Sequence, residues 1–217
     1  MIRPNPIWRS VAILGAAGLV VTACGGNDTA KPKTTSSSSS SSTGGAIAKG
    51  DGTLTLGTLL PQTGSLAFLG PPEFAGVDLA IKEINDAGGV LGKPVKKFDS
   101  DSGDTSTDTA SQSVDRLISN KVDAIIGAAS SSVSLSVIDK ITGNGTLQIS
   151  PANTSDELTK YNDKGLYFRT APPDVLQGRV LGDLILADGN STVGILALQD
   201  SYGTGLAASA TKSITGG

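Results

Sequence analysis

Apolar residues recur at two different spacings along the chain beyond residue 50. The segment TLTLGTLL at residues 53–60 is rich in leucine and threonine and is closed by Pro61, which is typical of a strand. Proline is common at the start of helices and glycine at their ends, so a helix is predicted between Pro71-Pro72 and Gly88-Gly89. Its apolar side chains have the spacing of one helical face: Phe74, Val77, Ile81 and Ile84.

The alternation of strand and helix continues along the rest of the chain. Further strands are predicted at residues 94–99, 122–127, 146–150, 166–169 and 191–198. Helical segments are predicted around residues 110–118, 133–141, 156–160, 174–187 and 202–214. On the helix 174–187, we expect four side chains to point inward: Leu176, Val180, Leu184 and Ile185. Strands joined by helical crossovers form parallel sheets, so the predicted fold class is α/β, a Rossmann-like parallel sheet with helices on both faces.

The amino-terminal residues have the features of an export signal. Arg3 and Arg9 precede an apolar run at residues 11–21, which is shorter than the ~20 residues of a membrane-spanning helix. The run ends in Val-Thr-Ala-Cys, which resembles a bacterial lipobox. We therefore expect residues 1–23 to be a lipoprotein signal peptide and Cys24 to carry a diacylglycerol. The alternative is an ordinary secretory signal followed by a free thiol.

Residues 24–50 are predicted to form a flexible tether between this anchor and a domain at residues 51–217. The segment contains an unbroken serine run at residues 36–42 and almost no large apolar side chain. Such a composition buries too little surface to offset the entropy of ordering. The expected location of the domain is the outer face of the cytoplasmic membrane, held by lipid.

Composition narrows the function classes. The formal net charge is -3 and the domain has no basic run, which argues against nucleic acid as a partner. Histidine is absent and Cys24 is the only cysteine, which excludes a Ser-His-Asp or Cys-His site and a His or Cys zinc cluster within this chain. We expect no enzymatic activity, no metal and no cofactor.

The candidate site lies in the loops that follow the strands, because parallel α/β sheets bind ligands beyond the carboxyl ends of their strands. Ser130, Ser131 and Ser132 stand where a strand turns into a helix, and their hydroxyls and nearby N–H groups are suited to a carboxylate. The alternative is an ordinary serine N-cap. Ala152 and Thr154 occupy the next strand-end loop, which is expected to lie beside the serine loop.

Four sequence blocks carry a resemblance to a known family. They are GTLLPQTGSLAFLGPPEFAGVDLAIKEINDAGGVLGKPV, VDAIIGAASSSVS, LQISPANTSDELT and DSYGTG, in this order. In order and spacing they resemble the leucine/isoleucine/valine-binding family of periplasmic-type solute receptors. The similarity covers nearly all of residues 53–217. The block ISPANTSDELT is the most discriminating of the four.

The resemblance implies two Rossmann-like lobes that close on a free amino acid, the chain supplying the first lobe and the beginning of the second. It implies that Ser131, between Ser130 and Ser132, donates to the ligand carboxylate. Ala152 would supply a backbone carbonyl to the ammonium, and Thr154 would contact the ligand through its N–H and hydroxyl. Tyr202 matches an aromatic position at the edge of the second lobe. The implied partners are an amino acid and the permease subunits of an ABC transporter.

The resemblance has one departure and one gap. Leu69, next to Phe68, stands where the branched-chain receptors have a tyrosine, so side-chain specificity is left open. The acidic residue of the second lobe would lie beyond Gly217. We expect the sequence to be truncated, and a chain with half of the cleft to bind ligand weakly or not at all.

Other interpretations rest on weaker features. Residues 203–208 match the dinucleotide pattern G-x-G-x-x-A, but they follow the last predicted strand and no acidic residue follows them. DSDSGD at residues 99–104 resembles the start of a calcium loop, but the twelfth position is alanine. A sensory lipoprotein with the same binding fold is the main rival function. An envelope enzyme would need a Ser-Lys or carboxylate pair, and no such pair is evident.

Overall fold

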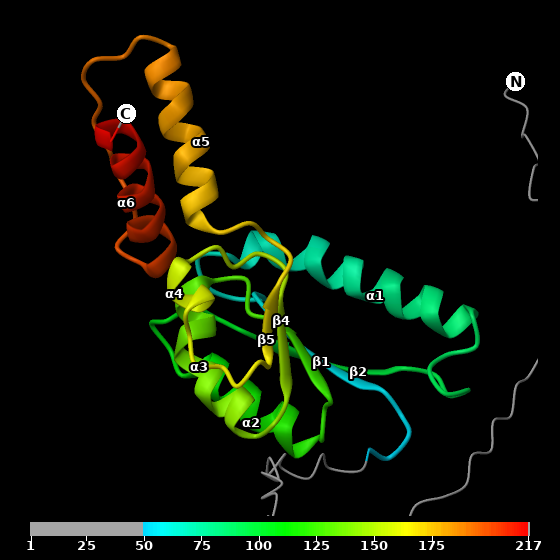
Figure 1. The fold of residues 1–217 in the computed structure, drawn as a ribbon. Coiled ribbons are helices and arrows are strands. Elements are labelled where there is room, and N and C mark those ends of the chain that lie inside the picture. The colour runs from blue at the N-terminus through cyan, green and yellow to red at the C-terminus, as the bar shows by residue number, and fades with distance from the viewer. Residues whose placement is uncertain (1–49, 217) are drawn as a thin grey trace, which may run out of the picture. The chain divides into compact units, whose positions relative to one another are not determined.

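The computed structural model of the protein describes residues 50–216, so the predicted signal peptide, Cys24 and the tether up to residue 49 lie outside the described residues. Five strands form one sheet in the order β2-β1-β3-β4-β5, and every neighbouring pair is parallel (Figure 1). The strands are β1 Thr55–Leu60, β2 Lys96–Asp101, β3 Ala124–Gly127, β4 Leu147–Ser150 and β5 Tyr167–Arg169. The predicted α/β class is confirmed.

The helices follow the predicted order along the chain. They are the short 3-10 helix η1 Ala67–Leu69, α1 Gly70–Asp86, α2 Thr109–Ser119, α3 Ser131–Gly143, α4 Asp156–Thr159, α5 Asp174–Ala187 and α6 Ser201–Gly216. Proline stands in the first turn of α1, and Gly88 and Gly89 follow its end with positive φ angles of 104° and 75°. Glycine adopts this region without the steric penalty of a Cβ, so it ends the helix. None of the helices within residues 50–216 has both the length and the apolar composition that a membrane crossing needs.

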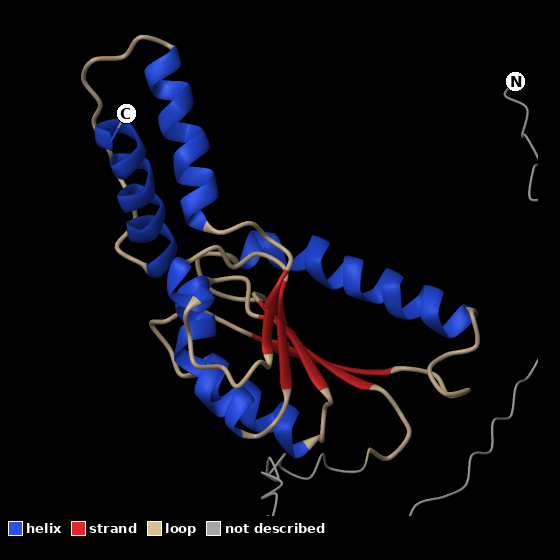
Figure 2. Cartoon of the chain, viewed as in Figure 1, coloured by secondary structure: helices blue, strands red, loops and turns tan. Residues whose placement is uncertain are grey.

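Helices cover both faces of the sheet, with α2 and α3 on one side and α1 on the other (Figure 2). The alternation of β1 explains this arrangement, because successive side chains of a strand point to opposite faces. Leu59 packs into the core with α2 and α3, whereas Thr58 donates to Asp99 on the α1 face (2.7 Å). The main core lies under α2 and α3 and contains Leu59, Ala110, Val114, Leu117, Val122, Ile125, Ala128, Val133, Val137 and Ile141.

Two predictions about the last third of the described chain are wrong. Residues 191–198 form no strand, and Leu196 and Leu198 are 102% and 70% exposed. A strand is defined by its hydrogen-bonded neighbour, and the described residues offer this segment none. On α5, Leu176, Val180 and Leu184 are also more than 40% exposed, so they do not point inward.

The buried face of α5 consists of glycine. Gly178 and Gly182 are its buried residues besides Asp174, and they face Ser209 and Ser213 of α6. A Cβ on Gly178 would lie 2.5 Å from the Cβ of Ser209, so the backbones of the two helices approach closely only because the side chain is absent. The pair α5 and α6 packs side by side and extends beyond the carboxyl ends of the strands (Figure 1).

Candidate functional site

The two candidate loops lie together because β3 and β4 are neighbours in the sheet. The strands pair in parallel, with Ile126 opposite Ile149, so their carboxyl ends meet at the same edge. The serine loop, residues 128–132, and the proline-alanine loop, residues 151–155, both begin at this edge. The structure therefore confirms that they converge.

The three serines have three different roles in the fold. Ser130 is the N-cap of α3 and its Oγ accepts from the N–H of Val133 (3.4 Å). Ser131 is only 3% exposed, and its Oγ accepts from the N–H groups of Thr154 (3.2 Å) and Ser155 (3.3 Å). Ser132 Oγ accepts from the N–H of Ser201, the first residue of α6 (2.9 Å). The serine loop is thus a junction between the proline-alanine loop and α6.

Buried polar side chains hold the proline-alanine loop in place by hydrogen bonds. Ser150 donates to the carbonyl of Ala128 (2.7 Å) and its Oγ accepts from the N–H of Ala152 (3.2 Å). These bonds fix the backbone of Ala152, whose carbonyl was predicted to contact a ligand. The loop is therefore ordered at Ala152 without a ligand, so a ligand that contacted this carbonyl would not have to order the loop.

Asn153 was not singled out in the sequence, although it stands in the discriminating ISPANT block. Its side chain is fully buried and donates to the carbonyl of Ala129 (2.8 Å), which joins the two loops a second time. Tyr167 donates its hydroxyl proton to Asn153 Oδ1 (2.9 Å). Burial raises the pKa of Tyr167 to about 12, so this proton is retained at neutral pH. An asparagine in a loop is usually interpreted as a turn residue, so the sequence alone does not indicate that Asn153 joins the two loops.

Thr154 is anchored through its backbone and not through its side chain. Its N–H donates to Ser131, and its carbonyl accepts from the N–H of Asp174 (2.8 Å). The hydroxyl oxygen is buried and has no hydrogen-bond partner among residues 50–216. Buried hydroxyls are normally satisfied, so this one keeps Thr154 a candidate for contact with a ligand.

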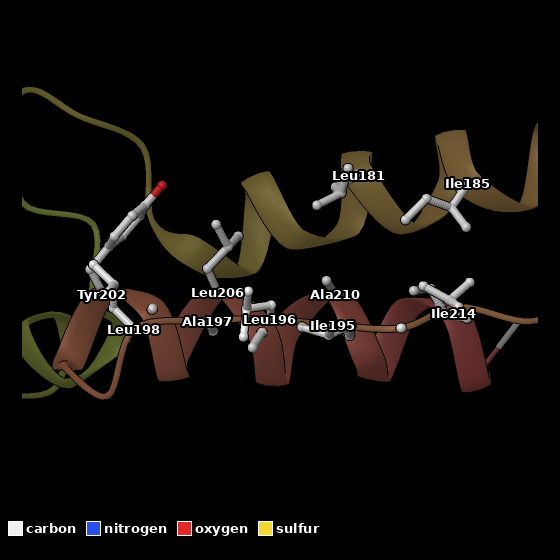
Figure 3. Close-up of a pocket in the computed structure, with 14 residues that line it drawn as sticks. Leu181, Ile185, Ile195, Leu196, Ala197, Leu198, Tyr202, Leu206, Ala210 and Ile214 are labelled. Atoms are coloured by element: carbon white, nitrogen blue, oxygen red, sulfur yellow. The ribbon is translucent and has the colours of Figure 1, made fainter.

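Tyr202 is in the first turn of α6, next to Ser201, whose N–H donates to Ser132 of the serine loop (2.9 Å). Its ring is 40% exposed and lines an open apolar cavity of about 370 Å³ between α5, α6 and residues 193–198 (Figure 3). Aliphatic side chains of α5 and α6 face each other across this cavity, among them Leu181, Ile185, Leu206 and Ile214. Phe68, at 72% exposure, and Leu69 lie in the 3-10 helix before α1.

The geometry does not favour the dinucleotide and calcium alternatives. Residues 203–208 are inside α6 and follow no strand, so the strand-turn-helix context of a dinucleotide fingerprint is not met. Asp101 accepts from the N–H groups of Gln62 (2.8 Å), Thr63 (3.1 Å) and Gly103 (2.8 Å), which fixes the loops after β1 and β2. Within residues 50–216, no group of three or more acidic, His or Cys side chains is arranged to hold a metal ion.

Comparison with known proteins gives consistent matches. Residues 53–217 match the family model described as periplasmic binding protein. Leu/Ile/Val-binding protein homolog 3 of Brucella melitensis biotype 1 is 30% identical over 156 residues, which are 71% of this chain and 42% of that protein.

Two solved structures carry different ligands. The branched-chain amino acid transporter substrate binding protein LivJ from Streptococcus pneumoniae, in complex with isoleucine, is 28% identical with a TM-score of 0.62 over 74% of this chain and 46% of LivJ. An ABC transporter solute binding protein from R. palustris, in complex with benzoate, is 26% identical with a TM-score of 0.66 over 76% of this chain and 45% of that protein. The chain spans less than half of the length of each of these relatives.

Proposed function

The chain belongs to the periplasmic binding protein family, and on this premise we propose that it binds a branched-chain-like amino acid or a related small molecule for delivery to an ABC importer. The relatives named above include a Leu/Ile/Val-binding protein homolog and a transporter protein in complex with isoleucine, which supports this ligand class. The proposed role is binding and hand-over without chemical conversion of the ligand.

The proposed contacts are Ser131, the Ala152 carbonyl and Thr154, and one observation carries them. The Thr154 hydroxyl is buried and accepts no hydrogen bond from residues 50–216, and it stands on a loop that the Ser131 hydroxyl holds in place. The two bonds that Ser131 accepts use its oxygen lone pairs and leave its proton for a ligand carboxylate. Ser130 caps α3 and Ser132 bonds the start of α6, and Tyr202 would approach the ligand from the side of α6.

We expect L-leucine at millimolar concentration to shift the amide resonances of Ser131, Ala152 and Thr154 in NMR spectra of the chain. Such a titration detects binding even when it is weak. A panel of amino acids, amides and small carboxylates, benzoate included, defines the ligand class. If no amino acid shifts these resonances and none raises the thermal stability of the complete gene product, the proposed function is wrong.

Removal of the Thr154 hydroxyl tests whether this side chain contacts the ligand. Thr154→Val should weaken leucine binding by about 1–3 kcal/mol, the usual loss of a hydrogen bond to a charged group. The substitution keeps the N–H that bonds Ser131. Thr105→Val, on an exposed turn, is the matched control and should bind as the parent does. Equal affinity of Thr154→Val and the control would remove Thr154 from the site.

We also propose that the protein is exported and that Cys24 carries a lipid anchor. Cells fed labelled fatty acid should incorporate the label into the parent chain and not into Cys24→Ser, and the variant should leave the membrane fraction. Two acyl chains hold a protein firmly, at about 0.8 kcal/mol per buried methylene, so the difference in partition should be large. Ser36→Ala in the serine run is the control. Label retained in Cys24→Ser would contradict the anchor.

A further inference from the structure

Asp174 is a buried carboxylate for which the fold supplies no obvious partner. It is the first residue of α5 and its side chain is 0% exposed. Neither carboxylate oxygen makes a hydrogen bond within residues 50–216. Carboxylates are rarely buried without compensation, so an unpaired one points to a function or to a partner that binds there.

Three elements meet at this carboxylate. The N–H of Asp174 donates to the carbonyl of Thr154 (2.8 Å), so the start of α5 is fixed to the proline-alanine loop. On the other side, a Cβ on Gly205 of α6 would lie 2.8 Å from Asp174 Oδ2, so the glycine leaves room for the carboxylate in its present position. The amino-terminal end of α5 also favours a negative charge electrostatically.

The Thr154 hydroxyl is the natural complement of this carboxylate. Both groups are buried and form no hydrogen bond of regular geometry within residues 50–216, but the Thr154 hydroxyl is close enough to Asp174 for a hydrogen-bonding contact that lowers the pKa of this carboxyl. An ionised carboxylate can only accept a hydrogen bond, whereas a hydroxyl has one proton and two lone pairs. If the Thr154 proton turns toward Asp174, the lone pairs of Thr154 are left for a donor on the ligand.

We infer that Asp174 is a positioning residue that sets the direction of the Thr154 hydroxyl and thereby makes the site prefer a ligand with a protonated amine over a plain carboxylic acid. This inference rests on the proposed function and adds a specificity determinant to it. It bears directly on the choice between isoleucine and benzoate, the ligands of the two related structures.

The preference should depend on pH. Burial raises the pKa of Asp174, with smaller increases from Asp156 on α4 and Asp200 before α6, while Thr154 and Arg169 of β5 act in the opposite direction. Above this raised pKa the carboxylate accepts from Thr154. Below it the protonated acid can donate to Thr154 instead, and the hydroxyl then turns its own proton toward the ligand. The amine preference should therefore fall as the pH drops through the pKa of Asp174.

The test compares L-leucine with 4-methylpentanoate, which has the same side chain and carboxylate but no amine. We expect the parent chain to prefer leucine and Asp174→Asn to lose about tenfold of that preference, because the Asn amide can donate to Thr154. Asp188→Asn, the same charge change at the exposed end of α5, is the matched control and should keep the parent preference. An unchanged preference in a folded Asp174→Asn variant would overturn the inference.

A ligand-free arm separates this inference from the proposed function. In an NMR pH titration of the parent chain, the Thr154 methyl resonance should move with the same midpoint as the Asp174 carboxyl resonance, above the ordinary range for an aspartate. The movement should vanish in Asp174→Asn and persist in Asp188→Asn. If leucine does not bind at all, the proposed function fails, and this titration alone decides whether Asp174 sets the direction of the Thr154 hydroxyl. A Thr154 resonance that ignores Asp174 refutes it.

Discussion

Gly127→Ala should destabilise the chain by about 3 kcal/mol or more, because it combines overpacking with backbone strain. Gly127 ends β3 with φ at 129°, a conformation that side chains rarely tolerate. A Cβ at this position would lie 2.0 Å from the carbonyl oxygen of Leu59 on the neighbouring strand. The clash is with backbone, so no rotamer change relieves it. Urea unfolding followed by circular dichroism measures the loss.

Gly143→Ala is the matched control for this substitution. Gly143 is the last residue of α3, and a Cβ there would meet no atom within 4 Å. Alanine has the higher helix propensity, so the control should be neutral or more stable by up to about 1 kcal/mol. A Gly127→Ala variant as stable as this control would show that β1 and β3 can move apart at little cost.

Gly178→Ala should loosen the helix pair α5 and α6, at a cost of about 2–3 kcal/mol from overpacking. The added Cβ would lie 2.5 Å from Ser209 Cβ and 2.7 Å from the backbone nitrogen of Ala210. Amide hydrogen exchange should therefore accelerate in α5 and α6 while β3 keeps its protection. The measurement distinguishes local opening of the helix pair from global loss of stability.

Gly76→Ala provides the comparison for the helix pair. Gly76 is on α1, and a Cβ there would meet no atom within 4 Å. This variant should exchange as the parent does in α5 and α6. If Gly178→Ala gave the same pattern as Gly76→Ala, the close approach of the two helices would not depend on the glycine.

Local sequence patterns were sufficient for most of the fold because they reflect local physics. The helix predicted at residues 174–187 has these bounds in the structure, and the strand predicted at residues 122–127 is observed at Ala124–Gly127. The face of α5 was mispredicted because hydrophobic spacing assumes that large apolar side chains make the contact. Here Gly178 and Gly182 make it. The segment 191–198 has a strand-like composition, but composition does not supply the neighbour that a strand needs.

The candidate site was predictable to the level of its loops. Parallel topology places the loops after β3 and β4 side by side, and Ser131 and Thr154 are indeed bonded through the N–H of Thr154. Their contacts with a ligand stay a prediction. Asp174 was missed because an acid at the start of a helix is common and reads as dipole compensation. Only its burial and the close approach of Gly205 set it apart.

The shared hydroxyl of Ser131 has a consequence for how this site can vary. One oxygen holds two backbone N–H groups of the next loop and, in the proposed function, also presents its proton to the ligand. A substitution at this position would change loop order and ligand affinity together, so its effects should be strongly non-additive with those at Thr154. Ligand affinity could therefore change through substitutions at Thr154 or Asp174 with the loop intact, whereas a substitution at Ser131 would also disturb the loop.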